Sequence, residues 1–77
     1  MTQQTEWTFR IDGMTCAHCA RAVDDMLLEV PGVLRSRTSH ADQRAVVVVG
    51  PEAGPQELEA AIEEAGYRVR ERSSRPV

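Results

Sequence analysis

Residues 13–19 read Gly-Met-Thr-Cys-Ala-His-Cys and contain both cysteines of the protein, Cys16 and Cys19. The stretch lies where a strand-like pattern of side chains gives way to a helix-like one. Two thiols at this spacing, on a turn that leads into the N-terminus of a helix, can share one soft metal ion. We therefore interpret the rest of the chain as a scaffold for this turn.

The segment before the turn is predicted to be a strand, and the segment after it a helix. Residues 6–11 alternate, with Trp7, Phe9 and Ile11 on one face, which is typical of a half-buried strand that ends at Asp12-Gly13. From Ala17 to about Val30 the spacing becomes helical, and the polar side chains Arg21, Asp24, Asp25 and Glu29 face outward. The buried stripe of this helix is predicted to be Ala20, Val23, Leu27 and Val30, and Pro31-Gly32 ends it.

The second half of the chain repeats the alternation of strands and a helix. Residues 33–39 show a weak strand pattern, residues 40–43 form a polar turn, and the valine-rich residues 44–49 predict a central strand. Pro55 suits the first turn of a second helix, and Gly66 its C-terminal end. Its buried stripe is predicted to be Leu58, Ala61, Ile62 and Ala65. Residues 67–71 are predicted to form a short last strand.

The resulting order is strand, helix, strand, strand, helix, strand. This order predicts an α+β fold of the ferredoxin-like βαββαβ type, an antiparallel four-stranded sheet with both helices packed on one face. We expect one domain over residues 1–71. Residues 72–77 lack periodicity, so we expect a flexible tail or the start of a linker.

Composition excludes several classes of function. The chain has 77 residues, a formal net charge of −3 and no lysine, and its charges form no block, so we expect no nucleic-acid partner. The longest apolar run, residues 45–49, is far too short to cross a membrane, and the polar start of the chain does not resemble a signal peptide. We therefore expect a cytoplasmic protein, in which a reducing environment keeps both cysteines as free thiols.

The cysteine pair itself favours a weakly coordinated, exchangeable metal. The dipole and free N–H groups of a helix N-terminus favour thiolates, which prefer Cu(I), Hg(II) or Ag(I) to hard cations. Structural zinc normally takes four ligands, whereas this turn offers two. A dithiol redox module is the alternative from another class, but the strand order differs from that of thioredoxin.

The motif Gly-Met-Thr-Cys-X-X-Cys, together with Val-Pro-Gly-Val at 30–33 and Ala-Gly-Tyr at 65–67, resembles the heavy-metal-associated domain family. The resemblance covers residues 6 to about 70. It implies a non-catalytic domain that binds Cu(I) through Cys16 and Cys19 and passes it to a partner with a matching dithiol, such as a copper-transporting P-type ATPase. It also implies a monomer or a metal-bridged dimer. The alternative is a mercury-binding domain, for example the N-terminal part of a mercuric reductase, in which case the chain is a fragment of an enzyme.

Four further residues are candidates for tuning the site. We expect Met14 to pack against the core rather than to bind metal, because flexible thioethers fill small cores well. Thr15 flanks the pair. His18 lies between the cysteines and is either a solvated residue or one that tunes the thiolates, contacts a partner or binds a shared metal. In the family fold Tyr67 approaches the metal loop, either as a core aromatic or with a dedicated role.

Overall fold

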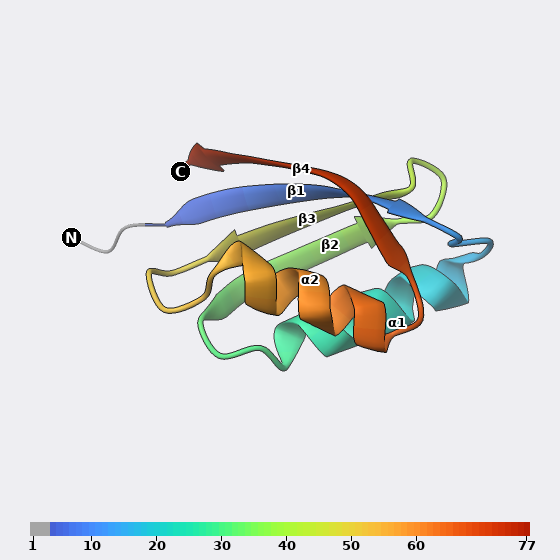
Figure 1. Cartoon of the computed structure of the whole chain (residues 1–77), viewed down its shortest axis with the longest axis horizontal. Helices are drawn as coiled ribbons and strands as arrows, with labels where there is room; N and C mark the ends of the chain where they lie inside the picture. The colour runs from blue at the N-terminus through green and yellow to red at the C-terminus, as the bar shows by residue number, and fades with distance from the viewer. Residues whose placement is uncertain (1–3) are drawn as a thin grey trace.

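The computed structural model describes residues 4–77. The elements are β1 (Thr5–Asp12), α1 (Ala17–Leu28), β2 (Val33–Ser39), β3 (Arg44–Val49), α2 (Pro55–Glu64) and β4 (Arg68–Pro76). The strands form one antiparallel sheet in the order β2-β3-β1-β4. Both helices cover the same face of this sheet (Figure 1). The predicted βαββαβ architecture is confirmed.

The core lies between the sheet and the helices. Alternate residues of the two central strands point into it, and the predicted stripes of both helices meet them there. Burying these apolar side chains is the main favourable term for so small a domain. The fully buried large side chains are Phe9, Ile11, Val23, Leu27, Val47, Val49, Leu58 and Ile62.

Helix α1 is tied to the edge strand β2 by Asp24. Its carboxylate accepts hydrogen bonds from Ser36 Oγ at 2.7 Å, from Thr38 Oγ1 at 2.6 Å and from the Thr38 backbone N–H at 3.3 Å. The prediction that Asp24 simply faces solvent is therefore wrong. The helical pattern placed Asp24 among the outward-facing polar residues and could not show that two hydroxyls of β2 lie opposite it.

The turn after α2 places Tyr67. Gly66 has a φ of +98°, its N–H donates to the carbonyl of Glu63 at 2.9 Å, and the N–H of Tyr67 donates to the carbonyl of Ile62 at 3.3 Å. These two bonds form a Schellman motif, which needs a left-handed residue and therefore favours glycine. The motif reverses the chain so that Tyr67 returns toward the start of α1.

The predicted tail at residues 72–77 differs from the structure. Strand β4 continues to Pro76 and stays paired with β1 as far as Thr5. The sequence showed no periodicity because residues 70–76 of this edge strand are exposed and mostly polar. Backbone pairing and ion pairs such as Arg75 to Glu6, at 2.7 Å, hold the strand instead of an apolar face.

Three connections gather at one end of the molecule (Figure 1): the loop before α1, the β2–β3 turn and the α2–β4 turn. The start of β1 and the C-terminus lie toward the opposite end. Within residues 4–77, neither helix has the length and apolar character needed to cross a bilayer.

Candidate metal centre

Cys16 and Cys19 lie together at the N-terminus of α1. Cys16 is the residue before the helix, in an extended conformation, and its carbonyl accepts hydrogen bonds from the N–H groups of Cys19 at 3.1 Å and Ala20 at 3.4 Å. The two Sγ atoms are 3.5 Å apart. Both thiols are free, with Cys16 exposed and Cys19 half-buried. The pair is therefore reduced, adjacent and open to solvent on one side.

The electrostatic surroundings favour the thiolate form of Cys19. The hydroxyl of Tyr67 is the largest cause, followed by hydrogen bonds from the Thr15 backbone and the Cys16 side chain, and together they lower the pKa of Cys19 to about 6. Partial burial acts in the opposite direction but is outweighed. The same interaction raises the pKa of Tyr67, so Cys19 loses its proton first and Tyr67 stays a neutral donor. At pH 7 Cys19 is mostly a thiolate, the form that binds soft metals.

The loop before the cysteines is shaped by Gly13. Its φ is +97°, a conformation that side chains rarely adopt, and a Cβ placed on it would lie 3.6 Å from Cδ1 of Tyr67. The Tyr67 ring thus packs over the loop beside the cysteines. The position that the family resemblance implied for Tyr67 agrees with the structure.

The remaining candidate residues, Met14, Thr15 and His18, lie in different surroundings. Met14 is 4% exposed and belongs to the hydrophobic core, so its side chain holds the loop against the core. Thr15 Oγ1 lies 3.9 Å from the Sγ of Cys19. His18 is exposed on the first turn of α1. In the part of the chain that the structure describes, no group of three or more His, Cys, Asp or Glu side chains converges.

Gln43, which the sequence analysis missed, holds the loop from the β2–β3 turn. Its Oε1 accepts a hydrogen bond from the Met14 N–H at 3.2 Å, and its Nε2 donates to the Met14 carbonyl. The same Nε2 also donates to the carbonyl of His40, at 2.6 Å, within its own turn. A glutamine in a polar turn carries no signal of such a contact, because Met14 lies 29 residues earlier in the chain.

A shallow hollow lies next to the loop. Its volume is about 560 Å³, and the Arg70 guanidinium pairs with the Asp12 carboxylate at 3.0 Å on its wall. Gly13 of the loop and Tyr67 both line the hollow. Its lining is Asp12, Gly13, Glu63, Gly66, Tyr67, Arg68 and Arg70.

Comparisons with known proteins agree with this arrangement. The sequence model described as the heavy-metal-associated domain matches residues 8–68. The chain is 39% identical over 61 residues to a probable copper-transporting ATPase, PacS, of Synechocystis sp., covering 79% of this chain and 8% of the ATPase. It is 41% identical over 61 residues to a mercuric reductase of Shigella flexneri, covering 79% of this chain and 11% of the reductase.

A solved structure named CopZ metallochaperone superposes with a TM-score of 0.82 at 26% identity, covering 84% of this chain and 98% of that one. The match therefore covers nearly the whole of that chain. It spans only about a tenth of the two enzymes.

Proposed function

We infer the function of this chain from its family, since it belongs to the heavy-metal-associated domain family. A domain of this family is not itself catalytic. On this premise Cys16 and Cys19 bind one Cu(I) ion and pass it to a partner that has a matching dithiol. The observation that carries the proposal is the adjacent pair of free thiols, Cys16 exposed and Cys19 half-buried, with sulfurs 3.5 Å apart and the pKa of Cys19 lowered to about 6.

Two thiolates satisfy Cu(I) but leave it open to a third ligand. Metal–sulfur bonds of about 2.3 Å, the zinc–thiolate value, would place two sulfurs about 4.6 Å apart if they were in line. The sulfurs therefore separate slightly on binding, which the exposed side chain of Cys16 allows. In the transfer step a thiolate of the partner forms a third bond to the ion. One of the two original Cu–S bonds then breaks, and the released thiolate stays ionised or takes a proton from water.

The partner is proposed to be a copper-transporting P-type ATPase or another protein with a similar dithiol. Support comes from the ATPases among the relatives and from the likeness to a metallochaperone. We place the exchange in the cytoplasm, where thiols stay reduced. The domain acts as a monomer, or as a dimer bridged by the metal, in which His18 of each copy lies near the shared ion.

A mercury-binding domain is the second candidate, because the mercuric reductase of Shigella flexneri and the ATPase PacS each match 79% of this chain. Two thiolates satisfy Hg(II) as well as Cu(I), and Ag(I) has the same preference for sulfur. A dithiol redox module is less well supported. The order of the elements differs from that of thioredoxin, and the relatives are copper-transporting ATPases and mercuric reductases.

A competition titration of the reduced protein with Cu(I), Hg(II) and Zn(II), without oxygen, tests the proposal. We expect uptake of about one equivalent of Cu(I) and weak binding of Zn(II). Cys16→Ser and Cys19→Ser should each lower Cu(I) affinity by orders of magnitude with an unchanged far-UV circular dichroism spectrum. Met14→Leu, which replaces the thioether in the core, should retain the affinity. Full affinity in either serine variant would contradict the two-thiolate site, and selective retention of Hg(II) in the presence of excess competing thiol would favour the mercury candidate.

A further inference from the structure

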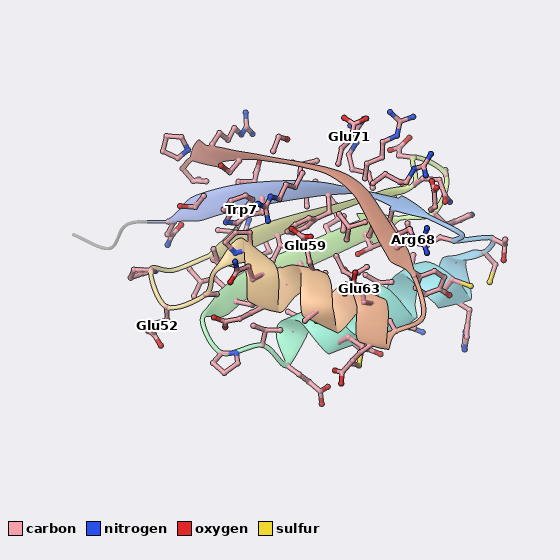
Figure 2. All side chains as sticks on the ribbon, viewed as in Figure 1. Trp7, Glu52, Glu59, Glu63, Arg68 and Glu71 are labelled. Carbon is pink, nitrogen blue, oxygen red and sulfur yellow. The ribbon has the colours of Figure 1, made fainter. Side chains whose placement is uncertain are left out.

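The fold separates charges that are mixed in the sequence. Eight of the nine arginines lie in the four strands, and only Arg21 lies in a helix. The helices instead contain Asp24 and Asp25 in α1 and four glutamates in α2. Both helices cover one face of the sheet, so the helix layer is mainly acidic, and among the strand arginines Arg72 pairs with Glu59 of that layer. The open face of the sheet is rich in arginine, because five of the strand arginines lie on it: Arg10, Arg35, Arg37, Arg44 and Arg75. Figure 2 shows Glu59 and Glu63 on the helix side and Glu71 on the opposite side.

The strand register identifies the side chains on the open face. Residues paired across an antiparallel sheet lie on the same face. Because Ala45, Val47 and Val49 are buried under the helices, the alternate residues of β3 point the other way. Three rows result: Ser39–Arg44–Arg10–Glu71, Arg37–Val46–Thr8–Ser73 and Arg35–Val48–Glu6–Arg75.

Three arginines of these rows have no acidic partner within the described residues. Arg10 pairs with Glu71 at 3.9 Å and Arg75 with Glu6 at 2.7 Å, both on the β1–β4 side. On the β2–β3 side, no described salt bridge involves the exposed residues Arg35, Arg37 and Arg44. Between them lie two half-buried valines. We call this set, Arg35, Arg37, Arg44, Val46 and Val48, the arginine face.

A recess extends the arginine face toward β4. Its volume is about 280 Å³, and Arg10 and Arg44 both line it. Arg35 and Arg37, two residues apart on β2, stand about 7 Å from each other along the strand. Like charges held this close repel each other, and an anionic partner relieves that repulsion.

We propose that the arginine face is a docking surface for an acidic protein surface that carries carboxylates around one apolar side chain. The carboxylates pair with the three free guanidinium groups, and the apolar side chain covers Val46 and Val48. The arginine face consists of five side chains, far fewer than the roughly 20–30 residues per partner of a standard stable interface, so the contact is transient. Protein fits this face better than nucleic acid, because none of the three rows contains an aromatic side chain for base stacking.

The proposal goes beyond metal binding and does not depend on it. The row that contains Arg44 lies at the loop end of the sheet, since the preceding residue, Gln43, holds Met14. A partner docked on the arginine face therefore reaches, at the Arg44 row, the same end of the sheet as the loop before α1, whereas the Arg35 row lies two rows farther from that loop. The acidic helix layer repels the same partner, so the charge separation also orients it.

Amide chemical shifts of the reduced, metal-free protein test the proposal directly. The titrant is a short glutamate-rich peptide with a central leucine, compared with the same peptide carrying serine at that place. We expect shifts concentrated at the arginine face, weaker binding of the serine peptide, and weaker binding of both at higher salt. The double variant Arg35→Gln/Arg37→Gln should bind about tenfold more weakly, the sum of two exposed ion pairs. The matched control Arg21→Gln, in the helix layer, should bind as the parent does.

Several results would overturn the proposal. They are the absence of binding, shifts on the helix layer instead of the sheet, or an equal loss in Arg21→Gln. A DNA duplex or anionic phospholipid vesicles that shift the same residues at lower concentration would also overturn it, in favour of a nucleic-acid or membrane surface. All the substituted arginines are exposed, so folding of the variants is not at issue.

Discussion

The side-chain amide of Gln43 bonds both backbone polar groups of Met14, as acceptor from its N–H and as donor to its carbonyl. Met14 is buried in the core, and Cys16 follows two residues later. The loop that leads to the cysteines is therefore held from two sides, by apolar packing of the Met14 side chain and by a polar clamp on its backbone. This clamp connects the β2–β3 turn to the metal loop.

Gln43→Ala should loosen the metal loop without removing a metal ligand. Three hydrogen bonds are lost, two to Met14 and one to the His40 carbonyl, so we expect the free energy of unfolding to fall by about 1–3 kcal/mol. Exchange of the Met14 amide proton with solvent should become faster. Cu(I) affinity should fall, because the loop before Cys16 would then have to become ordered when the ion binds. Hydrogen-exchange measurements and a Cu(I) competition titration give the two readouts.

Two further variants separate the clamp from a general loss of stability. Gln43→Glu keeps the acceptor for the Met14 N–H but loses the donor, so its effect should be intermediate. Gln56→Ala changes an exposed glutamine on α2 and should leave both readouts unchanged. Parent-like exchange of the Met14 amide in Gln43→Ala would show that the clamp does not hold the loop.

Tyr67→Phe should make the Cys19 thiol less acidic. The Tyr67 hydroxyl is the largest cause that lowers the pKa of Cys19 to about 6, and its removal destabilises the thiolate. In the parent, alkylation of Cys19 by iodoacetamide should increase with pH around a midpoint near 6. In Tyr67→Phe the midpoint should move upward. Mass spectrometry of the alkylated peptide distinguishes Cys19 from Cys16.

Thr15→Val serves as the graded control, because its hydroxyl is the last of the causes that lower the pKa of Cys19. The alkylation midpoint of this variant should move less than that of Tyr67→Phe.

The pH dependence of folding stability follows from the same shift in the pKa of Cys19. Because the pKa of Cys19 is lower in the folded protein, the thiolate stabilises the fold at alkaline pH, and this contribution is lost as pH falls through about 6. An unchanged alkylation midpoint in Tyr67→Phe would refute the assigned role of the hydroxyl.

Asp24→Ala should destabilise the fold while leaving the metal site intact. Its carboxylate accepts three hydrogen bonds from β2, and their loss should cost about 1–3 kcal/mol in the free energy of unfolding. The neighbouring Asp25 is exposed, so Asp25→Ala should change stability by no more than about 0.5 kcal/mol. Urea denaturation measures both. Equal effects of the two substitutions would mean that the contact between α1 and β2 contributes nothing.

The alternation and helical spacing of apolar residues predicted the elements because each pattern follows from local geometry. Residues 33–39 and 44–49 were predicted with the bounds that the structure shows, and α2 begins at Pro55 as expected. Helix α1 ends at Leu28, before the predicted end near Val30, because Val30 N–H turns back to the Leu27 carbonyl at 3.1 Å. The prediction failed for residues 72–76 because an exposed edge strand has no buried face to impose a period.

The sequence by itself determined the order of the elements, the composition of the core and the two thiols at the start of α1, since spacing along the chain decides all three. Only the tertiary structure decided which distant residues meet. It brought Tyr67 to Cys19, Gln43 to Met14 and Asp24 to β2, and it collected scattered arginines on one face of the sheet. The physical reason is that these contacts depend on strand register and turn geometry, which arise from packing of the whole chain and leave no periodic trace in the sequence.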